Sequence, residues 1–136
     1  MDNKAAELLE SLTDPEIDAL VEIMLLAACS DGSLDYVEVS VLKQSMRRVD
    51  EHWLSHVDLN ERIERAKVRI AEESREIRLA KLRTMLPWPE QRLLALKLAA
   101  RIVTADGQVQ PSERELMLQA AEALGVRSEL AKELIP

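Results

Sequence analysis

A short motif occurs twice in this chain, 75 residues apart. The first copy reads DGSLDYVE over residues 31–38, and the second reads DGQVQPSE over residues 106–113. Each copy follows one apolar stretch and precedes another, and apolar positions keep their register across the offset. A matched set of helix, Asp-Gly turn, aliphatic residue, Glu and helix predicts a duplicated supersecondary unit.

Composition favours helices around one core. The chain has 136 residues, which is the size of one ordinary domain. It is 47% hydrophobic and 32% charged, with three glycines and no Phe, and it is rich in the residue types that form helices. We therefore expect an all-α, compact single-domain bundle of about seven helices spanning residues 1–136, with pseudo-repeated halves at about 14–50 and 89–125.

Start and stop signals define the elements of the first half. A short helix is expected over residues 5–12. The run TDPE over residues 13–16 is typical of a helix start, with an N-cap candidate and a Pro near the first helical position. This helix should run over residues 14–29 and end at the first Asp-Gly turn. Asp35 and Glu38 are predicted to be the N-cap and the N3 acid of the next helix. The expected core positions of the helix over 14–29 are Ile17, Leu20, Val21, Met24 and Ala28.

Similar signals divide the second half. Asp58 is expected to cap a long helical segment whose apolar stripe shifts near Glu73-Ser74, which indicates two helices or a break. Prolines at 87 and 89 predict a boundary. A helix then leads into the second Asp-Gly turn, and the next helix begins near Pro111 and ends at Gly125. Ser128 is expected to cap a last short helix.

Charge is unevenly distributed. Residues 1–38 carry ten acids and one base, whereas residues 39–101 carry nine acids and fourteen bases. The sign alternates along residues 61–81, which is typical of a solvated helix with i,i+4 ion pairs. Three aromatic residues in the whole chain offer no stacking platform, so nucleic acid is not an expected partner. Neither a signal sequence nor an apolar membrane span is found, which favours a cytoplasmic protein without membrane insertion.

The acids of the two turns are the candidate site. Each turn matches the second half of an EF-hand loop, but the positions of the first acidic ligands hold Ala27 and Cys29, then Ile102 and Thr104. Two interpretations remain open. In one, the acids bond their own turns and complete capping boxes. In the other, a pseudo-twofold axis brings the turns together and pools carboxylates around a hard divalent cation, with Ca²⁺ as the expected ion. The predicted metal ligands are Asp31, Asp35, Glu38, Asp106 and Glu113.

Other candidate residues favour structural roles. His52 and His56 have a helical spacing that can bind Zn²⁺, but two solvated histidines are the favoured interpretation. Cys29 is expected to be a small buried hydrophobe. Trp88, between two prolines, is either an anchor or an exposed contact. The chain has no H-E-x-x-H, phosphate-binding loop or dinucleotide fingerprint, so it is not expected to be an enzyme.

The pair LLAACSDGSLDYVEVSVL and AARIVTADGQVQPSERELM resembles the TerB-like family, the all-helical tellurite-resistance module that also occurs attached to J-domain co-chaperones. The family signature is A-x-x-D-G-x-aliphatic-x-x-x-E after an apolar helix, and the resemblance runs over residues 14–135. It implies a bundle of about seven helices, acids associated with divalent-cation binding, and a role in stress response or docking without enzymatic activity. By position, the signature falls on Asp31, Glu38, Asp106 and Glu113, with Asp35 as a neighbour.

Two function hypotheses follow. The first is a non-enzymatic cytoplasmic TerB-like module that binds a divalent cation through the clustered acids and docks an unidentified protein partner in a tellurite or metal stress response. The second is a metal-independent helical scaffold whose acids cap helices and whose basic middle segment binds an acidic protein partner.

Overall fold

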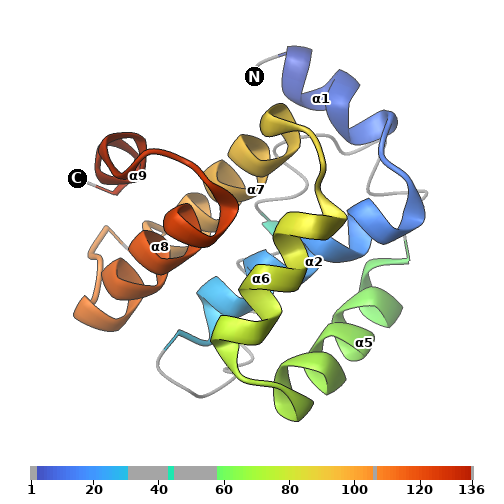
Figure 1. Cartoon of the computed structure of the whole chain (residues 1–136), viewed down its shortest axis with the longest axis horizontal. Coiled ribbons are helices and arrows are strands. Elements are labelled where there is room, and N and C mark those ends of the chain that lie inside the picture. The colour runs from blue at the N-terminus through green and yellow to red at the C-terminus, as the bar shows by residue number, and fades with distance from the viewer. Residues whose placement is uncertain (1–2, 31–42, 45–57, 106, 136) are drawn as a thin grey trace.

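The computed structural model describes residues 3–30, 43–44, 58–105 and 107–135 of the chain. Seven α-helices have described bounds, and no strand occurs in these ranges. Figure 1 shows the helices gathered into one bundle, which confirms the all-α prediction. The helix predicted after the first Asp-Gly turn lies outside the described residues, so the pseudo-repeat stays a prediction. The helices are α1 (Asn3–Glu10), α2 (Asp14–Ala28), α5 (Leu59–Glu72), α6 (Arg75–Met85), α7 (Pro89–Val103), α8 (Pro111–Leu124) and α9 (Ser128–Leu134).

Helix α2 is the centre of the bundle. It packs against α5, α6, α7 and α8, and among the described helices its contact with α7 is the most extensive. The five predicted core positions on α2 are buried, but eleven of its fifteen residues are buried in all. The predicted single apolar stripe was therefore too narrow. A helix with neighbours on several sides buries most of its circumference.

Local side-chain bonds fix the helix starts. Thr13 forms a capping box with Glu16: the Thr13 N–H donates to Glu16 Oε1 over 2.9 Å, and the Glu16 N–H donates to Thr13 Oγ1 over 3.4 Å. Asp58 and Ser74 accept from the backbone N–H groups of Glu61 and Ile77, over 3.1 and 3.3 Å. The predicted break near Glu73-Ser74 is thus confirmed as the boundary between α5 and α6.

The predicted boundaries of the last two helices, α8 and α9, agree with the structure except at one residue. Gly125 ends α8 with a left-handed φ of 74°, and the Val126 N–H donates to the Ala121 carbonyl over 2.8 Å. The predicted N-cap of α9 at Ser128 was wrong, because the cap falls on Arg127 and Ser128 is the first helical residue. No helix among the described residues is both long enough and apolar enough to cross a membrane.

Candidate functional site

The turn between α7 and α8 carries the second copy of the Asp-Gly motif. Thr104 ends α7, and its Oγ1 donates to the Ala100 carbonyl over 2.7 Å. The Gly107 N–H then donates to the Thr104 carbonyl over 3.0 Å. Gly107 has a φ of 83°, a left-handed conformation in which a Cβ is strained even though a methyl group would meet nothing within 4 Å. The backbone therefore explains why this position needs glycine.

Glu113, the last acid of this motif, contributes to the start of α8. Its Oε1 accepts the backbone N–H of Gln110 over 2.8 Å, and Pro111 occupies the first turn of the helix. The Glu113 side chain is half-buried. The predicted capping role is therefore confirmed for this residue. A carboxylate has two oxygens with several lone pairs, so one capping bond does not by itself exclude a metal ligand.

The other four predicted ligands, Asp31, Asp35, Glu38 and Asp106, lie outside the described residues. The same is true of His52, Trp53 and His56. Within the described ranges, no group of three or more His, Cys, Asp or Glu side chains is placed to hold a metal ion. The pooling of the five acids stays a prediction, and a metal site that uses Glu113 would have to recruit some of those four acids.

A second set of charged side chains joins α2 to α5. Asp14, Asp18 and Glu22 are four residues apart, so they follow one face of α2. Arg62 donates to Asp18 Oδ1 over 2.7 Å and to Asp14 Oδ1 over 3.0 Å. Arg65 donates to Asp18 Oδ1 over 3.2 Å. The acidic face of α2 is thus matched by a basic face of α5.

Glu22 is the buried centre of this charged layer, with 0% of its side chain exposed. Arg69 of α5 donates from Nε to Glu22 Oε1 over 2.7 Å. Arg78 of α6 donates from Nε to Oε2 over 2.6 Å and from Nη2 to Oε1 over 2.8 Å. This fork is the bidentate arrangement that a guanidinium and a carboxylate prefer. Three helices are therefore linked through one buried carboxylate.

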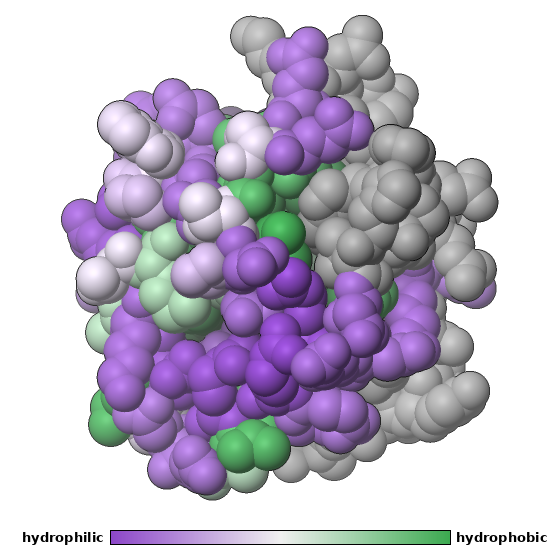
Figure 2. Space-filling view, turned by 90° about the vertical axis from the view of Figure 1, so that its right-hand side faces the viewer, coloured by the Kyte–Doolittle hydropathy of each residue, from purple (hydrophilic) through white to green (hydrophobic). Residues whose placement is uncertain are grey.

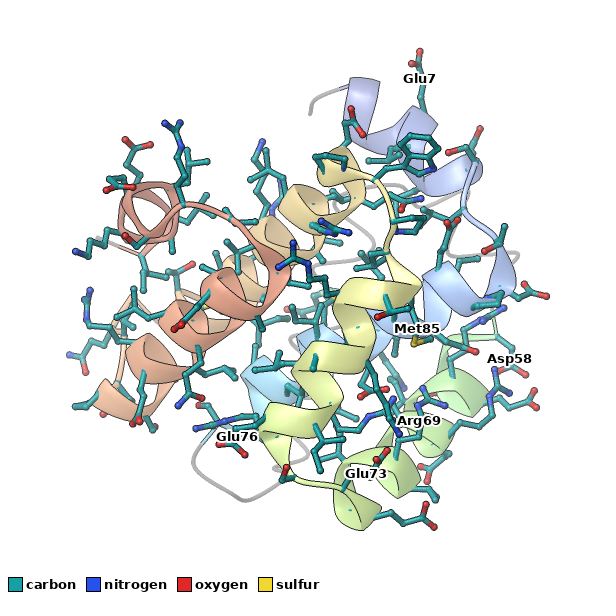
Figure 3. The ribbon with its side chains drawn as sticks, viewed as in Figure 1. Glu7, Asp58, Arg69, Glu73, Glu76 and Met85 are labelled. Carbon is teal, nitrogen blue, oxygen red and sulfur yellow. The ribbon has the colours of Figure 1, made fainter. Side chains whose placement is uncertain are left out.

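Glu73 extends the layer to the surface at the α5–α6 corner. Its Oε2 accepts from Lys81 Nζ and its Oε1 from Arg78 Nη1, each over 2.7 Å. These bonds, with Lys81 the larger cause, lower the pKa of Glu73. The hydrogen bonds to Glu22 are the main reason that the pKa of Arg78 is raised above its usual value. Figure 3 shows Arg69 on α5 and Glu73 at the end of that helix, and Figure 2 shows hydrophilic side chains gathered low on the face where α5 lies.

The charge pattern of the sequence predicted only part of this layer. A predicted i,i+4 pair exists between Glu61 and Arg65, and Glu64 and Lys67 form a pair at i,i+3. Arg62, Arg69 and Arg78 instead reach across to α2. The signal that could have found these pairs is the spacing of the acids at 14, 18 and 22 beside bases at 62, 65 and 69, both of which are helical stripes.

Trp88 and Cys29, the two other candidate residues, lie within the described part of the chain. Trp88 is 63% exposed between Pro87 and Pro89, so the interpretation of this residue as a buried anchor was wrong. Cys29 is half-buried, and its Sγ donates to the Leu25 carbonyl over 3.0 Å. It therefore lies at the edge of the core instead of within it.

Comparison with known proteins identifies the family. The family model described as tellurite resistance protein TerB matches residues 49–134. The matched region contains α5 to α9 and the second Asp-Gly turn, whereas the first turn precedes it. Searches of the curated proteins and of the solved structures found no match. Since the matched region is more than half of the chain and agrees with the resemblance of the two motifs, the chain belongs to the TerB family.

Proposed function

We propose that this TerB-family chain is a non-catalytic helical module that binds a divalent cation through the acids of its two Asp-Gly turns. The observation that carries the proposal is the family match across the second turn, where Gly107 adopts the left-handed conformation of a tight turn. Ca²⁺ is the first ion to test, because hard carboxylate oxygens and a sharp glycine turn suit it. The proposed ligands are Asp31, Asp35, Glu38, Asp106 and Glu113.

The contact between α2 and α7 supports the pooling of the two turns. These are the two helices that lead into the Asp-Gly motifs, and they pack against each other in the middle of the bundle. Five carboxylates brought close together repel one another unless a cation balances their charge. A shared divalent ion would therefore stabilise an arrangement that is unfavourable without it.

The chain's role, in this proposal, is to dock a protein partner in a tellurite or metal stress response inside the cytoplasm. The family description supports the stress-response part. The exposed Trp88 supports docking, since a large aromatic side chain held between two prolines is a preformed apolar contact. Ion binding would then regulate or stabilise the docking module.

One observation favours the metal-independent alternative. Glu113 already has a structural use, because it caps α8 through Gln110. A second observation counts against the other part of the metal-independent alternative, in which the basic middle segment binds an acidic protein partner. Arg62, Arg69 and Arg78 of this segment are bonded to acids within the same chain.

The two functions separate in a thermal unfolding experiment on metal-stripped protein. An ion that binds only the folded state stabilises it by mass action. At a hundredfold excess of ion over Kd, the free energy of unfolding rises by about 2.7 kcal/mol, and the melting temperature rises with it. We expect Ca²⁺ to raise the melting temperature by several degrees and EDTA to reverse the change. Mg²⁺ and Zn²⁺ are the comparison ions. No shift with any of the three ions would eliminate the metal-binding function.

Glu113→Gln sharpens this test. The amide oxygen of Gln can still accept the Gln110 N–H, so the cap survives while the anionic ligand is lost. We expect Glu113→Gln to reduce the Ca²⁺ shift with little change in the metal-free melting temperature. Glu16→Gln is the matched control, because Glu16 makes the same capping bond at the start of α2. Equal Ca²⁺ shifts in the two variants would leave Glu113 as a cap only.

A further inference from the structure

Three consecutive apolar residues, Pro87, Trp88 and Pro89, are exposed at the corner between α6 and α7. Trp88 is 63% exposed, more than any other large hydrophobic side chain in the described part of the chain. Burial of an aromatic ring is strongly favourable, so an exposed apolar run of this kind is uncommon on a protein surface unless it has a function. We refer to residues 87–90 as the Trp88 corner. Its indole is an apolar contact that the packing of the described helices leaves unused.

The Trp88 corner is held rigidly. The Trp88 N–H donates to Gln91 Oε1 over 3.2 Å, and the Trp88 carbonyl accepts from the N–H groups of Gln91 and Arg92 over 3.0 and 3.2 Å. Arg92 Nε also donates to the Leu86 carbonyl over 2.7 Å. The prolines on either side of Trp88 have a fixed backbone angle φ. A contact that is already ordered loses little entropy on binding, which favours Trp88 as an anchor for a partner.

Acidic side chains lie near the Trp88 corner. Glu90 is exposed in the first turn of α7, two residues after Trp88. Glu16 of α2 lies beside Gln91, because the pKa of Glu16 is lowered mainly by the Thr13 N–H and in part by the Gln91 side chain. The start of α2 is therefore joined to the start of α7 through a residue that also holds Trp88.

Helix α1 adds further acids on the same side of the bundle. Figure 1 shows α1 leading into the start of α2 on the side where α7 begins, and Figure 3 shows Glu7 directed away from the bundle. Glu7, Glu10 and Glu90 are exposed, and none of them forms an ion pair with another described residue. Arg92 is half-buried and bonded to backbone carbonyls at the end of α6. The acids at 7, 10, 16 and 90 thus outnumber the bases at 4 and 92.

We propose that the Trp88 corner docks a basic segment of a partner protein, with an arginine stacked on the Trp88 indole and further basic side chains near Glu10 and Glu90. A guanidinium is planar and stacks on an indole, whose face attracts a cation. The chain has a net charge of −7, which attracts a basic partner and repels an acidic one or a second copy. The proposal rests on the docking part of the proposed function, for which it names the chemistry of the partner, and it does not depend on metal binding.

Peptide titrations followed by NMR test the proposal on the full chain. The probes are short Gly-Ser peptides that carry three arginines, three citrullines or three glutamates; citrulline keeps the shape of arginine without its charge. The reporters are the Trp88 indole N–H and the Gln91 backbone N–H, and the backbone N–H of the fully buried Met117 is the internal control. We expect the arginine peptide to shift both reporters saturably with a Kd below about 1 mM, and the affinity to fall in about 0.5 M sodium chloride.

The comparison among the peptides tests the charge of the partner. Tighter binding of the arginine peptide than of the citrulline peptide, with no saturable response to the glutamate peptide, would support the proposal. Equal affinity for the arginine and citrulline peptides, or tighter binding of the glutamate peptide, would overturn it. The absence of a saturable shift at the Trp88 corner with the arginine peptide would overturn it as well.

Variants locate the bound peptide. Because Trp88 is exposed, Trp88→Ala should leave the fold intact and weaken binding by about tenfold, as followed at the Gln91 N–H. Glu90→Gln should weaken binding by about twofold, as expected for one exposed charge. Val68→Ala, at a side chain 54% exposed on α5, and Glu129→Gln on α9 are the matched controls. Equal affinities in Trp88→Ala and Val68→Ala would place the peptide elsewhere and overturn the site.

The peptide titration and the Ca²⁺ melting experiment can fail independently, because both use the same metal-stripped full chain. Binding of the arginine peptide without a Ca²⁺ shift would retain the basic partner and eliminate metal binding. A Ca²⁺ shift without peptide binding would overturn the basic partner and leave metal binding in place.

Discussion

Helix α2 packs against its neighbours in two different ways. It packs against α7, and the buried residues of these two helices are largely Leu and Ala. Its contact with α5 and α6 also includes the charged layer of Asp14, Asp18 and Glu22 with their arginines. Apolar contact is favourable in many geometries because burial is non-directional, whereas a forked ion pair requires one arrangement.

The difference indicates separate roles for the two faces. Burying Glu22 and Arg78 removes both charges from water, and their attraction recovers that cost only when the geometry is good. We therefore expect the apolar face to supply most of the stability, and the charged face to fix how α5 and α6 sit on α2. Four experiments test whether the two faces differ in this way.

Arg78→Met should be the most damaging change. It leaves Glu22 buried with one cationic partner in place of two, and breaking a buried pair costs about 3 to 5 kcal/mol. Urea denaturation measures the loss, and Lys97→Met is the surface control. The triple variant Glu22→Leu, Arg69→Met and Arg78→Met removes the buried charge entirely and should be more stable than Arg78→Met alone. A triple variant less stable than the single one would show that the charged face stabilises the fold in its own right.

Leu20→Ala tests the apolar face on the same helix, two residues from Glu22. Leu20 is 0% exposed, and loss of a buried leucine costs about 2 to 5 kcal/mol from transfer and cavity terms. The loss should be the same in low and high salt, because no charge is involved. A clear salt dependence of this loss, measured in parallel urea titrations, would break the distinction between the two faces.

Asp18→Asn tests the half-buried part of the charged layer. It removes the anionic acceptor of Arg62 and Arg65 and should cost about 1 to 2 kcal/mol. Salt screens partly exposed pairs, so the cost should shrink in about 1 M sodium chloride. Calorimetric melting at the two salt concentrations measures the change. An equal cost at both would mean that Asp18 acts by packing and not by charge.

The smallest expected effect is the contribution of Glu73 to the change in stability at low pH. Because Lys81 and Arg78 lower its pKa in the folded chain, Glu73 adds stability above its ordinary value of 4.5 and loses it as the pH falls through the lowered pKa. Glu73→Gln should therefore flatten the stability profile below pH 4.5. Glu129→Gln, an exposed acid on α9, is the control. Parallel profiles for Glu73→Gln and the original chain between about pH 3 and 5 would contradict this assignment.

Local signals predicted the helix boundaries well. Thr13, Asp58 and Ser74 cap the helices that follow them, since a short polar side chain before an apolar run has a strong local preference for this role. Gly125 ends α8 for the same kind of local reason. The errors are small shifts: the first helix, expected over residues 5–12, is α1 (Asn3–Glu10), and the cap of α9 is Arg127 in place of Ser128.

The candidate sites were less predictable. Glu113 was foreseen as a cap and as a metal ligand, and only the first role is tested by a described bond. The pairing of α2 with α5 and α6 was not predicted, because the bonded residues are 44 to 56 positions apart along the chain. Charge alternation along residues 61–81 looked like pairing within one helix.

Local sequence signals were enough to predict most helices, their breaks and the glycine turns at Gly107 and Gly125, because these features depend on interactions over a few residues. The sequence also carried the motifs that indicated the TerB family. The position of α2 at the centre and the pairing of its acids with arginines of α5 and α6 were visible only once the helices were packed together. Such pairings depend on which helix faces are brought together by burial of the apolar surfaces, and helical periodicity alone does not specify the partner of a charged face.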